Sequence, residues 1–113
     1  MTARLADEAI SFIDSACQDP FFLYFAFYTV HTPIQASKEH IAYYNQKLLE
    51  TDYSGQVAMR QEHEGITKLI QDNTAYASMV AAMDEAIGRV QSKLVELISC
   101  LNNMPMVKIF LRS

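Results

Sequence analysis

The stretch FFLYFAFY at residues 21–28, followed by TVHTP at residues 29–33, determines how the rest of the chain is interpreted. The first eight residues are apolar or aromatic without interruption, they follow Pro20, and they have the length of a β-strand. Because no polar residue alternates with the apolar ones, the pattern predicts a strand covered on both faces, as at the centre of a parallel sheet flanked by helices. The sequence therefore predicts an α/β fold with a central buried strand at residues 21–28.

Three amphipathic helices are predicted around this strand. Apolar residues at helical spacing place the first at residues 4–17 and the second at residues 38–49, with Ser37 as its N-cap. The third and longest is predicted at residues 75–101, where Thr74 is the expected N-cap and apolar residues alternate at spacings of three and four.

The remaining segments complete the predicted order α-β-α-loop-α-β. Residues 50–73 are polar and contain two glycines, which predicts a long irregular loop. Residues 106–111 follow Pro105 and are moderately apolar, which predicts a second strand. A chain of 113 residues offers too few helices to cover a sheet around the central strand. The pattern therefore predicts an incomplete domain.

Composition excludes several classes of function. The chain has 13 acidic and 9 basic residues, a net charge of −4, and no basic cluster, so nucleic-acid binding is not expected. The longest apolar run is too short to span a bilayer, and no signal peptide is recognised, so no membrane partner is expected. Cys17 and Cys100 lie on predicted apolar helix faces without metal-binding spacing, which predicts buried free thiols.

His31 is the strongest candidate for a functional side chain. It follows the predicted strand directly, at the carboxyl end where open α/β sheets bind ligands. An imidazole there can contact an anion or act as an acid or base, and the alternative is a structural histidine that bonds the loop backbone. His40 is expected to face solvent at the start of a helix. His63, between Glu62 and Glu64, is expected in a solvated loop.

Along residues 1–101 the chain resembles the sulfatases, and it is similar to an internal segment of that family. The resemblance is carried by the apolar strand that ends in His31-Thr32-Pro33, by Met83-Asp84 and Gly88-Arg89-Val90 in the long helix, and by the helix at residues 5–13. It implies an arylsulfatase-like hydrolase of the alkaline-phosphatase superfamily. The implied fold is α/β, and the implied reaction is the hydrolysis of sulfate esters of a sugar or an aryl alcohol.

The resemblance also implies the roles of particular residues. In the family, the histidine of the His-x-Pro loop contacts the substrate sulfate, and the matching residue here is His31. Thr32 and Gln35 are expected to line the entrance to the site. The family uses a metal, usually calcium, and a formylglycine made from Cys or Ser in a Cys/Ser-x-Pro-x-Arg motif. Neither cysteine of this chain stands in that motif, and the family's Asp and Asn metal ligands are not recognisable in it.

Residues 1–113 are therefore expected to form a single, incomplete segment of a sulfatase catalytic domain that is inactive in isolation. Its open sheet edges are expected to favour self-association. Sulfatases are commonly exported or lysosomal, and the sequence itself does not indicate a compartment. Two alternatives stay open. One is another member of the superfamily, such as a phosphodiesterase or phosphonate hydrolase. The other is a non-catalytic helical module that self-associates through the apolar stripe of residues 76–101.

Overall fold

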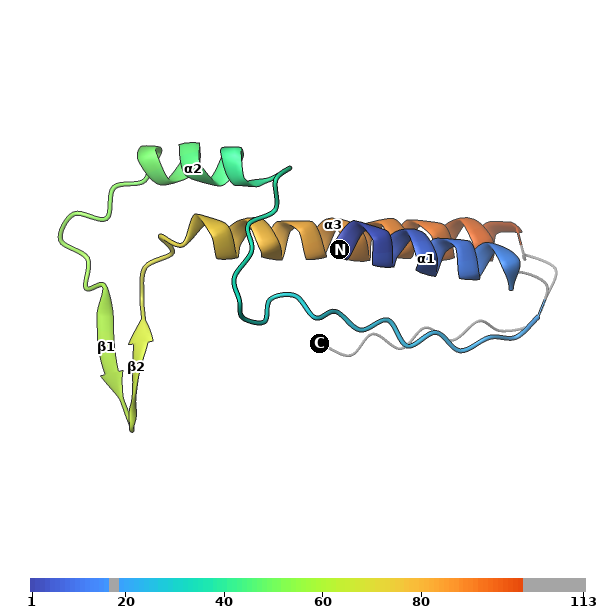
Figure 1. Ribbon diagram of the computed structural model, residues 1–113, viewed down its shortest axis with the longest axis horizontal. Coiled ribbons are helices and arrows are strands. Elements are labelled where there is room, and N and C mark those ends of the chain that lie inside the picture. Colours follow the sequence, from blue (N-terminus) through green and yellow to red (C-terminus); the bar gives the residue numbers. More distant parts are fainter. Residues whose placement is uncertain (17–18, 101–113) are drawn as a thin grey trace. The chain divides into compact units, whose positions relative to one another are not determined.

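The computed structural model describes residues 1–16 and 19–100, without the side chains of Ser99 and Cys100. Its elements are, in chain order, α1 (Thr2–Ser15), α2 (Ile41–Glu50), β1 (Met59–Glu62), β2 (Gly65–Lys68) and α3 (Thr74–Cys100) (Figure 1). They fall into two compact units. The first contains Met1–Ala26 and the chain from Glu85 onward, and the second contains Phe27–Asp84. Among the described residues, no helix is both long and apolar enough to cross a membrane.

The core of the first unit lies on one face of α1. Ala6, Ala9 and Ile13 are spaced by three and four residues and are buried. This spacing is that of one face of a helix, and the two small alanines allow close approach of a neighbouring element. The Glu85–Cys100 part of α3 contributes further buried side chains, including Val90 and Leu97.

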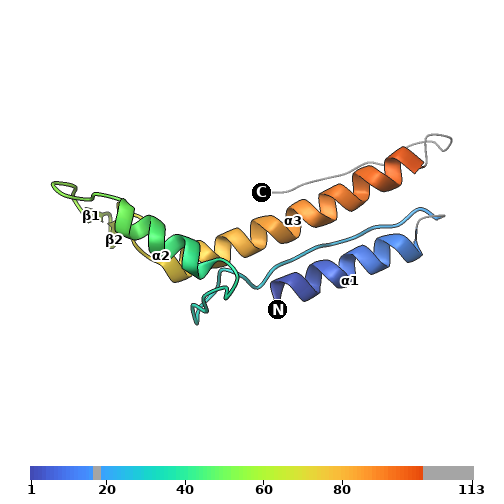
Figure 2. The same cartoon turned by 90° about the horizontal axis from the view of Figure 1, so that it is seen from above.

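Ion pairs join α1 to the later part of α3, which runs in the same direction (Figure 2). Asp7 pairs with Arg89, and Asp14 Oδ1 lies 2.7 Å from Lys93 Nζ. The hydrogen bond to Asp14 raises the pKa of Lys93 above its ordinary value. All four groups are partly or largely exposed, so these pairs stabilise the fold only weakly and mainly fix the register of the two helices.

Residues 21–28 differ from the strand predicted for them. The structure assigns no strand there among the described residues, and the central strand therefore stays a prediction. Phe22, Tyr24 and Tyr28 are 86%, 81% and 66% exposed, whereas the residues between them, apart from Ala26, are half-buried. This period of two is that of an extended chain with one open face. The described residues cover one face of this segment, so the expectation that both faces are covered stays a prediction.

The loop predicted for residues 50–73 contains a β-hairpin in its middle. β1 and β2 pair antiparallel from Met59↔Lys68 to Glu62↔Gly65, and His63 in the intervening turn has φ of 49°. Hydrogen bonds from Thr67 and then Arg60 lower the pKa of Glu62 below its usual value. This hairpin was not predicted from the sequence, because His-Glu is not among the residue pairs that are typical of tight turns.

The helix starts differ from those expected. Asn73, rather than Thr74, caps α3: its side-chain Oδ1 accepts a hydrogen bond from the Tyr76 N–H at 2.9 Å. α2 begins at Ile41 after His40, and Ser37 contributes its backbone carbonyl rather than a side-chain cap. The predicted strand at residues 106–111 and the thiols of Cys17 and Cys100 lie outside what the structure describes.

Replacing Ile13 by alanine is expected to lower the free energy of unfolding by about 2–5 kcal/mol, because the side chain is fully buried and its removal leaves a cavity. Urea titration followed by circular dichroism measures the change. The matched control is Leu49→Ala on α2, where the side chain is 87% exposed and a change within about 0.5 kcal/mol is expected. Equal losses in the free energy of unfolding of the two variants would contradict the assignment of Ile13 to the buried face of α1.

Candidate functional site: the His31 loop

The loop that carries His31 begins with a tight turn. The His31 N–H donates to the carbonyl of Tyr28 at 3.0 Å, and the two rings lie 5.2 Å apart between centroids, tilted by 42°. The Thr29–Val30 and Thr32–Pro33 peptide bonds are cis. The turn therefore places the imidazole beside the last aromatic residue of the 21–28 stretch, as the position of His31 in the sequence indicates.

One nitrogen of the His31 ring is already engaged. Nδ1 lies 2.8 Å from the carbonyl oxygen of Thr32. Because a carbonyl oxygen only accepts, Nδ1 carries the proton, and Nε2 of the exposed ring is left for a ligand. A neutral ring in this tautomer accepts a hydrogen bond at Nε2, and only the imidazolium donates one there. The ring can therefore bind an anionic oxygen in its charged form.

Helix α3 holds the other end of the loop. The Ser37 N–H donates to Ser78 Oγ at 3.0 Å, and Ser78 Oγ in turn donates to the Ala75 carbonyl at 2.7 Å. The Gln35 N–H approaches Met79 Sδ at 3.2 Å. Ser78 is fully buried, and Met79 is almost so. Sequence reasoning missed Ser78, although a small polar residue between apolar helix neighbours was a usable signal.

The side chains predicted beside His31 are present on the same loop. Thr32 supplies the carbonyl that fixes the imidazole, and Gln35 is tied to α3 through its backbone, while both side chains are exposed. Their role at an entrance stays a prediction. His40 is half-buried rather than solvent-facing, and it is the N-cap residue of α2 without a side-chain cap bond. His63 is exposed at the hairpin turn, as its polar neighbours indicate.

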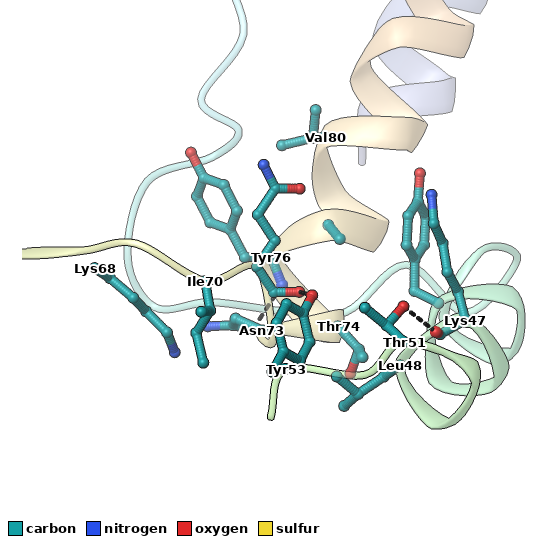
Figure 3. A pocket seen from close by; sticks show the side chains of 13 residues that line it. Lys47, Leu48, Thr51, Tyr53, Lys68, Ile70, Asn73, Thr74, Tyr76 and Val80 are labelled. Atoms are coloured by element: carbon teal, nitrogen blue, oxygen red, sulfur yellow. Dashed lines mark hydrogen bonds between the residues drawn. The ribbon is translucent and has the colours of Figure 1, made fainter. Parts of the chain in front are cut away.

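A separate pocket lies elsewhere on the second unit. It has a volume of about 600 Å³ and forms where the end of α2, residues 68–73 and the first turns of α3 meet (Figure 3). Three tyrosines and two lysines are among its lining residues: Tyr44, Tyr53, Tyr76, Lys47 and Lys68. None of the lining residues belongs to the His31 loop.

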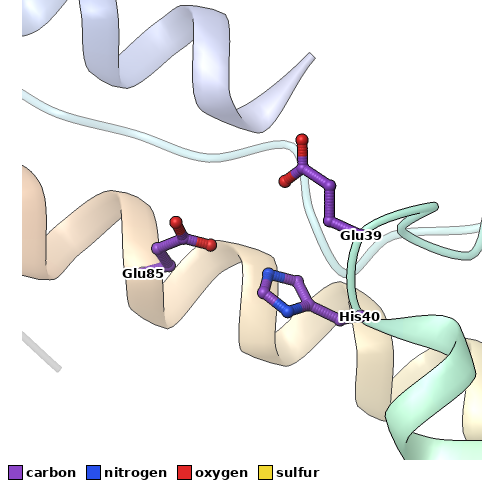
Figure 4. Close-up of side chains that lie close together, drawn as sticks. All are labelled: Glu39, His40 and Glu85. Carbon is purple, nitrogen blue, oxygen red and sulfur yellow. The ribbon is translucent and has the colours of Figure 1, made fainter.

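The calcium site that the sequence resemblance implies is not found among residues 1–16 and 19–100 within one unit. Glu39 and His40 adjoin before α2 in the second unit, whereas Glu85 is on α3 in the first (Figure 4). Within either unit taken alone, the described residues hold no group of three metal-ligating side chains. Calcium takes six to eight oxygen ligands, and the two neighbours Glu39 and His40 offer one carboxylate and an imidazole.

Comparison with known proteins identifies a family and a similar solved structure for most of this chain. The family model described as "Sulfatase" matches residues 1–98, which include His31 and its loop. A solved structure described as "Crystal structure of Ps i-CgsB" is similar with a TM-score of 0.59 and 29% sequence identity over 86% of this chain. The matched region is 17% of that structure's chain, so the present chain spans a small part of its relative's length.

Ser78→Ala is expected to loosen the His31 loop, because it leaves the Ser37 N–H without its acceptor. An unsatisfied buried donor costs about 1–3 kcal/mol, so exchange of the Ser37 amide with deuterium should quicken roughly 5- to 150-fold. NMR-detected hydrogen exchange measures this rate. The control is Ser92→Ala, at an exposed serine on α3. An unchanged Ser37 rate in Ser78→Ala would show that this bond does not hold the loop.

Proposed function

Because the chain belongs to the sulfatase family, we propose that it forms part of a sulfate-ester hydrolase in which His31 binds a sulfate oxygen of the substrate. The observation that carries this proposal is the arrangement of the His31 ring. The ring is exposed, and the Thr32 carbonyl fixes its orientation and leaves Nε2 available. The family match over residues 1–98 includes this loop.

The chemistry of this contact is a charge-assisted hydrogen bond. The imidazolium of His31 donates from Nε2 to a negatively charged sulfate oxygen, while Nδ1 stays bonded to the Thr32 carbonyl. Thr32 and Gln35 offer exposed polar side chains on the same loop, at the expected entrance for the alcohol part of the ester. That alcohol is a sugar or an aryl group.

These residues bind and orient the sulfate but do not cleave the ester. The 113 residues contain no Cys/Ser-x-Pro-x-Arg motif to supply the nucleophile, and the residues that the structure describes hold no set of calcium ligands within one unit. Ester cleavage needs a nucleophile and a group that stabilises the charge on the leaving oxygen. In the proposed enzyme those groups come from residues other than these.

The alternative of a helical module that associates through residues 76–101 is less well supported. Val90 and Leu97, which belong to the apolar stripe of α3, are already buried within the chain. A second helix would reach them only after the parts of this chain that bury them had moved away. This part of the stripe is therefore used for packing within the chain, whereas Tyr76 and Val80 are exposed.

The purified chain is expected to show no hydrolysis of 4-nitrophenyl sulfate, because one anion-binding histidine does not replace a nucleophile. Release of 4-nitrophenolate, followed by its absorbance, measures the reaction. The comparison sample is His31→Ala. Turnover by the unaltered chain that disappears in His31→Ala would contradict the proposal that these residues bind the sulfate but do not cleave the ester.

The sulfate contact itself is tested by binding. In NMR titrations with sodium sulfate, the ring signals of His31 are expected to shift with a Kd on the order of 10 mM, as one charge-assisted hydrogen bond allows. Sodium chloride at equal ionic strength is the control for screening. His63, which is also exposed, is the control residue, and its ring signals should not saturate. Equal responses of the two histidines would overturn the assignment of His31.

A further inference from the structure

The pocket of the second unit differs in charge from the chain around it. The full sequence has 13 acidic and 9 basic residues, yet the lining contains Lys47 and Lys68 and neither aspartate nor glutamate. Lys68 pairs with Asp72, which is not a lining residue, whereas Lys47 Nζ lies 6.0 Å from the centre of the Tyr43 ring. Because the Asp72 carboxylate offsets the charge of Lys68, the positive charge that favours an anionic ligand at this pocket is that of Lys47.

The walls of the pocket combine rings with polar groups. Tyr44, Tyr53 and Tyr76 form aromatic surface beside aliphatic lining residues. The Tyr53 hydroxyl donates to the Gln71 carbonyl at 2.8 Å and so holds the chain after α2 against the chain before α3 (Figure 3). Asn73 uses Oδ1 as the cap of α3, which leaves its side-chain N–H groups for a ligand.

We propose that this pocket binds a sugar ring that carries a sulfate ester, at a site separate from the His31 loop. The tyrosine rings and aliphatic side chains suit the C–H faces of a pyranose, and the amides of Asn73 and Gln71 suit its hydroxyl groups. Lys47 is the cation for the sulfate. The volume of about 600 Å³ falls within the range of small-molecule sites and exceeds that of one monosaccharide.

This site would hold a unit of the substrate remote from the ester that reacts. The choice of sulfate as the anionic group rests on the proposed function, whereas the lining itself requires only an anionic ring. Binding energy from a remote unit helps to orient the reacting ester. The proposal thus narrows the substrate class to saccharides of more than one unit with more than one sulfate.

The proposal is tested with galactose 6-sulfate as the probe and the full 113-residue chain. In NMR titrations the backbone amides of Ile70 and Ala77, both in the pocket lining, are expected to shift with a Kd of roughly 1–10 mM. Galactose alone and sodium sulfate alone are the comparison titrations, and each should shift these amides far less. Equal shifts with sodium sulfate would reduce the site to an anion site and overturn ring recognition. No shift with galactose 6-sulfate would overturn the proposal.

Two lysine variants test the assigned cation. Lys47→Gln keeps the aliphatic stem and removes the charge, and it is expected to weaken galactose 6-sulfate binding about fivefold. Lys38→Gln removes an exposed lysine that does not line the pocket and should leave the Kd unchanged. Circular dichroism confirms that both variants fold. Equal affinities of the two variants would show that Lys47 does not bind the anion.

A third variant separates this proposal from the function proposed for His31. His31→Ala should abolish the sulfate response assigned to the His31 loop and leave the shifts of Ile70 and Ala77 unaltered. Loss of the pocket response in His31→Ala would place both responses at one site and overturn the separate pocket. A pocket response without any His31 response would keep the pocket and overturn the sulfate contact instead.

Discussion

The hydrogen bond between the Ser37 N–H and the buried Ser78 hydroxyl is the constraint on which the candidate site depends. It ties the end of the His31 loop to a rigid helix, so the position of that loop does not depend on its own exposed residues. The Ser78 hydroxyl also donates to the Ala75 carbonyl and is thereby satisfied as both donor and acceptor. A buried polar group in this state stabilises one conformation, whereas the same group without partners would destabilise the fold.

Much of the helical structure is predictable from the sequence, because it depends on local periodicity. The buried positions Ala6, Ala9 and Ile13 lie at the spacing that the sequence shows. The N-cap residues were harder to predict than the helices themselves, because several polar residues precede each helix. The backbone geometry decides which of these residues accepts a hydrogen bond from the free N–H groups of the first turn. Asn73 rather than Thr74 does so at α3. The hairpin at residues 59–68 was missed because the central pair of its turn, His63-Glu64, contains neither glycine nor asparagine.

The candidate site was predictable from the sequence only in part, because the place of His31 in the sequence is a local feature and its contacts are not. His31 stands out by its place after an aromatic run, and its ring is exposed, while its role as a ligand contact stays a prediction. The Nδ1 contact with the Thr32 carbonyl and the support from Ser78 depend on the path of the chain, which no spacing reveals. The pocket lined by Lys47 and Tyr53 could not be predicted from the sequence either, because its residues come from segments that are distant in the sequence.

The division of the chain into units sets the order in which they can form during synthesis. The second unit, Phe27–Asp84, is continuous in sequence, so it can fold as soon as those residues leave the ribosome. The first unit joins the beginning of the chain to its later part, and the pair of Asp7 with Arg89 spans 82 positions. Helix α1 therefore obtains its contacts with α3 only when the second half of α3 has been made, whereas its contact with Phe21 is available earlier. Closing a loop of that length is slow compared with forming a helix or a hairpin.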